Sequence, residues 1–148
     1  MISSGGTERQ RGRLYLRLGR PICALLIAFG PIVLAQSDSA TIGKAEAVLK
    51  NLQDGRYGEV VKEFNPAMEK AISEERLRGV WEMLTAQFGA VKSIDERRSG
   101  ELKGYRAVEL ILSFERERVV QRVIFDSDGK IAGLAYQPAS MALLPAAK

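Results

Sequence analysis

Residues 105–138 read YRAVELILSFERERVVQRVIFDSDGKIAGLAYQP, and this stretch decides the fold. Apolar residues recur at strand spacing from 105 to 114, from 119 to 125 and from 131 to 136. Charged residues at 115–117 separate the first two runs, and Asp-Ser-Asp-Gly at 126–129 separates the last two. Both separators are typical of tight turns. The stretch therefore predicts three consecutive antiparallel strands.

Helical patterns precede the strands. Apolar residues at helical spacing run from Ile42 to Leu52, from Tyr57 to Phe64 and from Leu77 to Phe88. Residues 91–97 form a weaker strand candidate, followed by a turn at 99–104. Helices followed by an antiparallel meander predict an α+β fold, with N-terminal helices packed on one face of a sheet of about four strands.

Residues 1–35 have the pattern of a signal peptide. Five arginines (Arg9, Arg11, Arg13, Arg17, Arg20) precede an apolar run of about 13 residues, which is shorter than a membrane-spanning helix. Val33 and Ala35 suit the −3 and −1 positions of a cleavage site. We expect cleavage near Ala35 and a periplasmic or extracellular protein, with an uncleaved N-terminal anchor as the alternative. A polar lead-in (36–39), one domain (40–138) and a loosely ordered tail (139–148) would follow.

The composition narrows the function of this domain. The chain has 22 basic and 18 acidic residues, and removing the five arginines and Glu8 of the signal leaves 17 of each. The basic balance thus belongs to the signal, and no nucleic-acid partner is predicted. The chain has no histidine, and its one cysteine, Cys23, lies in the signal. Disulfides, histidine-based zinc sites and Ser-His or Cys-His catalysis are therefore excluded from the predicted domain.

Several short motifs occur in a familiar order. They are A-x-x-V-L-x-x-L-x-x-G-x-Y-x-x-V at 45–60, F-N-x-x-M at 64–68, L-x-x-x-W-x-x-L at 77–84, F-D-x-D-G-K-I-A-G-L at 125–134 and Y-x-P at 136–138. Together they resemble the bacterial and archaeal domain of unknown function family 3887. The resemblance implies a cone similar to SnoaL-like and cystatin-like folds, with helices packed into a strongly curved sheet. It implies no catalytic residues.

Some relatives in this family also carry an α/β-hydrolase domain. No G-x-S-x-G motif occurs in this sequence. We expect the domain to stand alone, and no peptidase activity is carried over.

The acidic turn at 126–129 resembles part of a calcium-binding loop. Aligning Gly129 with the glycine of a calcium-binding EF-hand loop puts Ile124 and Ala135 at its first and last ligand positions, where oxygen ligands are required. A hairpin turn is therefore favoured, and we predict no metal or cofactor.

Seven residues are candidates for a pocket: Tyr57, Phe64, Trp81, Tyr105, Glu109, Arg122 and Tyr136. The aromatic residues before the sheet fit either the core or a pocket wall. Glu109 and Arg122 fit either a solvated cross-strand pair or a pair inside the cone that orients a polar ligand.

The predicted function is that of an exported non-catalytic domain. It would bind a small ligand or a protein partner through the cone cavity or the sheet face. The alternative is a small histidine-free lyase, isomerase or hydrolase that uses Glu109 with Tyr105 or Tyr136. Apolar residues on both faces of the predicted sheet also favour a covered second face, and hence a homodimer through the sheet.

Overall fold

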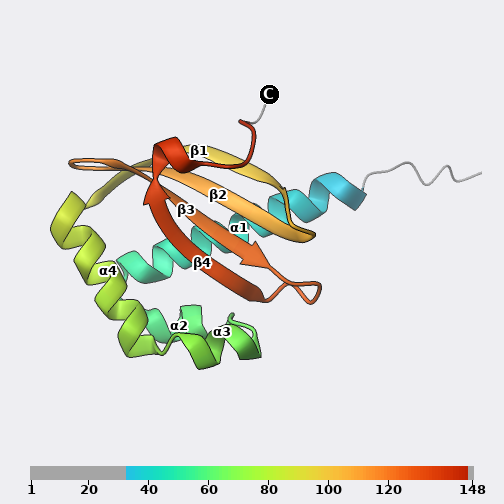
Figure 1. Cartoon of the computed structure of the whole chain (residues 1–148), viewed down its shortest axis with the longest axis horizontal. Coiled ribbons are helices and arrows are strands. Elements are labelled where there is room, and N and C mark those ends of the chain that lie inside the picture. The colour runs from blue at the N-terminus through green and yellow to red at the C-terminus, as the bar shows by residue number, and fades with distance from the viewer. Residues whose placement is uncertain (1–32, 147–148) are drawn as a thin grey trace, which may run out of the picture. The chain divides into compact units, whose positions relative to one another are not determined.

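A computed structural model describes residues 33–146 of the chain, with side chains from Asp38 onward. Within this part, the helices are α1 (Val33–Gln53), α2 (Tyr57–Val61), α3 (Pro66–Ala71) and α4 (Glu74–Phe88). The strands are β1 (Val91–Leu102), β2 (Tyr105–Phe114), β3 (Arg118–Phe125) and β4 (Ile131–Pro138), followed by a 3-10 turn at Ala139–Met141. The strands form one antiparallel sheet in the order β1-β2-β3-β4 (Figure 1). The predicted α+β fold is confirmed.

The segment that we expected to be a polar lead-in, 36–39, lies inside α1. Residues 33–42 contain no glycine or proline, so nothing in the sequence stops the helix from extending upstream of the predicted start. Among residues 33–146, no helix is both long and apolar enough to cross a membrane. Most of the predicted signal peptide lies outside the described residues.

Two helices are capped by the side chain that precedes them. Asn65 precedes α3 and accepts a hydrogen bond from the backbone N–H of Met68 at 2.9 Å. Ser73 precedes α4 and accepts one from Arg76 at 3.2 Å. These bonds satisfy backbone donors that the first turn of a helix leaves without partners.

Strand β1 is longer than the sequence pattern indicates. It pairs with β2 along Val91–Leu102, and the turn narrows to Lys103 and Gly104, whose φ angles are both positive (52° and 83°). Two register shifts between Val91 and Glu96 allow Val91 and Ile94 to pack against the core despite their irregular spacing. The pairing partner, rather than local alternation, sets the length of this strand.

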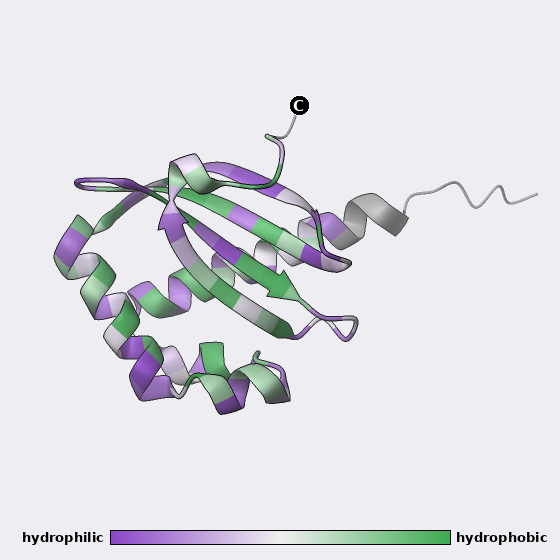
Figure 2. Ribbon diagram, in the orientation of Figure 1, coloured by the Kyte–Doolittle hydropathy of each residue, from purple (hydrophilic) through white to green (hydrophobic). Residues whose placement is uncertain are grey.

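The two faces of the sheet have different neighbours. Val108, Leu110, Leu112 and Phe114 of β2 belong to one core with the helices. Glu109 and the other residues that alternate with them lie on the opposite side, which we call the outer face. Figure 2 shows hydrophobic segments along β2 and β3, whereas the loops at the ends of the β2–β3 and β3–β4 hairpins are hydrophilic.

The acidic sequence at 126–129 forms the predicted hairpin turn. Asp126 accepts hydrogen bonds from the backbone N–H groups of Asp128 (3.0 Å) and Lys130 (2.9 Å), and from the side chain of Asn65. The bond from Lys130 is the main cause that lowers the pKa of Asp126 below its ordinary value. Its carboxylate oxygens are thus engaged in holding the turn.

Candidate functional site

The seven candidate residues do not line one pocket. Four lie on the helix side of the sheet: Tyr57, Phe64, Trp81 and Tyr136. Three lie on the outer face: Tyr105, Glu109 and Arg122. The sheet itself separates the two groups.

The helix side of the sheet around Trp81 is filled with side chains. The Trp81 ring lies 6.2 Å, centroid to centroid, from both Phe114 and Tyr136. The hydroxyl of Tyr136 donates to Gln121 Oε1 (3.1 Å), and Gln121 Nε2 donates to the carbonyl of Ala45 (3.0 Å). Burial raises the pKa of Tyr136, so its hydroxyl keeps its proton. These polar groups bond to the protein itself and complete the core.

Glu109 and Arg122 form a buried ion pair on the outer face. They are directly opposite each other on β2 and β3, as the predicted hairpin requires. Glu109 is fully buried and Arg122 is 8 % exposed. Arg122 Nε donates to Glu109 Oε1 at 2.7 Å, and Arg122 Nη2 lies 2.7 Å from the same oxygen. The pair is therefore cross-strand, as one interpretation held, but it is not solvated.

Residues 139–146 cover this ion pair, and we call them the strap. The backbone N–H of Leu143 donates to both oxygens of Glu109 (3.0 and 3.1 Å), and that of Leu144 donates to Oε2 (2.9 Å). In return, Arg122 Nη2 donates to the carbonyl of Met141 (3.0 Å), and Arg98 Nη1 donates to that of Leu144 (2.9 Å). The sheet thus holds the strap through its backbone.

Leu144 is the one side chain of the strap that is buried. It lies over Gly100 of β1, where an added Cβ atom would come within 3.0 Å of the leucine. We expected residues 139–148 to form a loosely ordered tail. The contacts of Leu143 and Leu144 with the sheet were not predicted. Residues 147–148 lie outside the described part of the chain.

The surroundings of Glu109 bear on the enzyme hypothesis. Both carboxylate oxygens accept hydrogen bonds from the protein. Tyr136 lies on the other side of the sheet, and Tyr105 is four residues away along β2, a separation of about 13 Å in an extended strand. Neither tyrosine is next to the carboxylate, so the structure does not bring the residues of that hypothesis together.

Sequence reasoning missed Arg98, Gly100 and the strap. The one available signal was the presence of two charges among apolar neighbours on adjacent strands, since such charges need a cover or a ligand. The Leu143-Leu144 pair in the tail was the matching apolar segment. Nothing in the periodicity of the tail connects it with β2.

An exposed apolar patch adjoins the strap. Leu102, Tyr105, Ile124 and Leu143 line one open depression at an end of the sheet together with charged residues such as Lys103 and Arg106, and we call the four apolar residues the outer patch. Tyr105 is 50 % exposed and Leu143 is 63 % exposed. Exposed apolar groups that gather in this way are typical of interaction surfaces.

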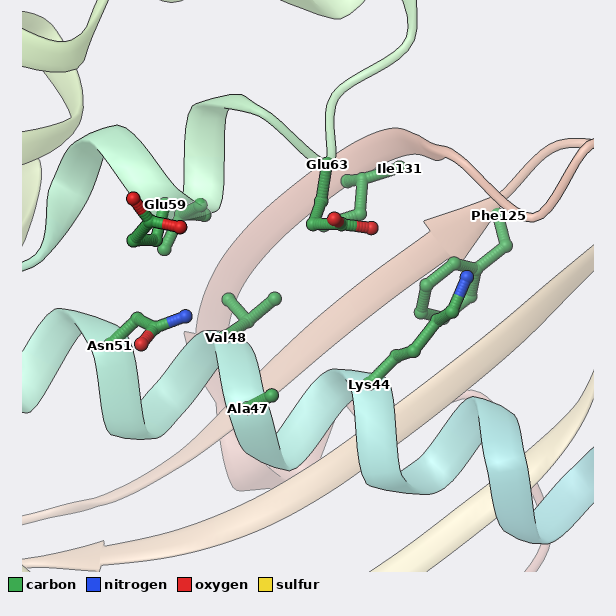
Figure 3. A pocket seen from close by; sticks show the side chains of 9 residues that line it. Lys44, Ala47, Val48, Asn51, Glu59, Glu63, Phe125 and Ile131 are labelled. Atoms are coloured by element: carbon green, nitrogen blue, oxygen red, sulfur yellow. The ribbon is translucent and has the colours of Figure 1, made fainter.

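A small cleft lies between α1, α2 and the sheet (Figure 3). Its volume is about 190 Å³, and Phe125 and Ile131 lie at one side of it. Lys44 is directed to the carbonyl of Gly129, to which it donates at 2.9 Å. This volume is below the range of about 300–1,000 Å³ that is usual for sites that enclose a small molecule.

The described part of the protein contains no cluster of side chains that could bind a metal ion. Within residues 33–146, no three Asp, Glu, His or Cys side chains are close enough together to hold a metal ion.

The fold and these surfaces together define a small α+β domain with a filled core and an outer sheet face that holds a polypeptide segment. The family model described as "Protein of unknown function (DUF3887)" matches residues 45–134. The chain belongs to this family, as its motifs indicated.

No curated protein and no solved structure matched the chain. The likeness to SnoaL-like and cystatin-like cones therefore stays a prediction.

The buried ion pair leads to a testable prediction about the stability of the domain. Glu109→Ala leaves Arg122 buried without its carboxylate and removes the acceptor of the strap amides. We expect it to lower the free energy of unfolding by about 3–5 kcal/mol. The double variant Glu109→Leu/Arg122→Met should lose less than the single variant, because no unpaired charge remains. Urea unfolding followed by circular dichroism measures both.

Glu59→Ala is the matched control. It removes the carboxylate of an exposed pair with Lys62 and should unfold close to wild type. If the double variant is as unstable as Glu109→Ala, an unpaired buried charge is not the cause of the loss.

Proposed function

We propose that the chain is an exported, non-catalytic protein-interaction domain that pairs with a second copy through the outer face of its sheet. The observation that carries the proposal concerns the exposed large hydrophobic side chains of the described residues. Three of the four, Tyr105, Met141 and Leu143, belong to the outer face or the strap on it, and the fourth is Met83 on α4. A gathering of this kind favours a protein partner.

The occupant that fits best is a second copy of the chain. After removal of the predicted signal, the chain has 17 basic and 17 acidic residues, so two copies carry no net charge that would repel. A twofold pair also needs only one self-complementary surface.

Two ion pairs on the outer face are compatible with burial in such a pair of copies. Besides Glu109 and Arg122, Arg98 lies 2.7 Å from Glu96 on the outer face. Covering these two ion pairs would therefore leave neither of them unpaired away from water, which is the costly case, while Lys103 at the edge of the patch would stay exposed.

Export rests on the arginine-rich and apolar pattern of residues 1–35. We expect the protein recovered from the periplasm or medium of an expressing bacterium to begin at or near Gln36. N-terminal sequencing measures this. A chain that keeps Met1 in the membrane fraction would support the uncleaved anchor instead.

Pairing is tested by sedimentation velocity over a range of protein concentrations. We expect a dimer at micromolar concentration for wild type. Tyr105→Lys should be a monomer, because it places a charge from each copy in an apolar contact.

Met83→Lys is the matched control, since Met83 is 59 % exposed and lies on α4, away from the outer patch. It should pair like wild type. A wild-type protein that stays monomeric at high micromolar concentration would exclude the proposal, and so would equal weakening by both substitutions.

A further inference from the structure

We propose that the outer face contains a peptide-binding groove, and that the strap is its resident ligand, held in cis. The groove consists of Glu109, Arg122, Arg98 and the space above Gly100. Its ligand class is a polypeptide segment with an aliphatic residue at one position, here Leu144, and successive backbone N–H groups that reach Glu109. This inference concerns a site beneath the strap and does not depend on pairing between copies.

The groove binds its ligand through hydrogen bonds to the polypeptide backbone. Glu109 accepts from two successive N–H groups of the strap, at Leu143 and Leu144. Arg122 and Arg98 donate to strap carbonyls on either side of them. Charged groups make stronger hydrogen bonds than neutral ones, so these contacts fix the position and direction of the bound segment.

One side chain supplies the sequence preference. Leu144 is 4 % exposed and fills the space above Gly100, which an alanine at that position would narrow. The neighbouring Leu143 points away and is 63 % exposed. The groove therefore selects an aliphatic residue at one position and tolerates variation at the next.

The strap is held by few groups, which makes it exchangeable. Its other described side chains are exposed or half-buried, and its hydrogen bonds to the sheet are made by its backbone. A segment from another protein with the same backbone geometry could make the same bonds. It would compete with a strap whose attachment gives it a high effective concentration.

The test uses the full chain with its strap released. In Leu144→Asp, a carboxylate replaces the buried leucine, and the strap should leave the groove while the core stays intact. The probe is a fluorescent peptide with the sequence of residues 137–148, titrated by anisotropy. We expect saturable one-to-one binding to Leu144→Asp, and binding at least about tenfold weaker to wild type, whose groove is occupied in cis.

Three controls fix the site. The same peptide with Leu144→Asp should not bind. Adding Glu109→Gln to the released chain should weaken binding, because the charged acceptor is lost. Adding Glu117→Gln, an exposed residue at the β2–β3 turn, should leave binding unchanged.

The experiment is carried out in the Tyr105→Lys background, so that failure of pairing and failure of peptide binding are separate results. If Leu144→Asp does not fold, as judged by circular dichroism, Leu144→Ala replaces it with the same readouts. A folded, strap-released chain that does not bind the peptide at millimolar concentration would overturn the proposal. Equal binding to wild type and to the released chain would overturn it too.

Discussion

The outer face of the sheet is built around a charge that has no access to water. Glu109 lies in the middle of β2 with no exposed surface, and its neighbours on the same face, Ala107 and Ile111, are apolar. A buried carboxylate is tolerated only when it is paired and hydrogen-bonded. Arg122 supplies the opposite charge, and two backbone N–H groups of the strap supply the remaining bonds. The strap therefore belongs to the folded domain, although no β-ladder holds it.

This constraint separates two roles of the sheet. The helix side, where Trp81 and Tyr136 pack, gives the domain its stability and encloses Gln121 with its partners. The outer side carries the buried pair of Glu109 and Arg122 beneath the strap and exposes Tyr105 and Leu143. Because the strap contributes Leu143 to the outer patch, its position affects both surfaces. Release of the strap would remove that side chain from the patch and uncover the groove, so peptide binding and pairing would oppose each other.

The sequence was sufficient for the parts of the fold that depend on local pattern. The hairpin at 126–129 and the pairing of Glu109 with Arg122 both follow from spacing within short segments. The burial of the ion pair could not be predicted, because the strap bonds to Glu109 from 34 residues further along the chain and has no periodicity. The grouping of Tyr136 with Glu109 ignored the alternation of strands. Tyr136 is opposite Gln121, whose side chain is on the other face from Arg122. The sequence thus identified several residues of the candidate site, but not how they are arranged in space.

The central claim is that Glu109 holds the strap on the outer face. Amide hydrogen exchange followed by NMR tests this most directly, because the claim concerns the N–H groups of Leu143 and Leu144. We predict that both amides exchange slowly in wild type and that Glu109→Gln speeds their exchange much more than that of the core amides of β2. Lys103, an exposed residue of the two-residue β1–β2 turn, serves as the internal reference. Exchange of Leu143 and Leu144 at the rate of that reference in the wild-type protein would contradict the account.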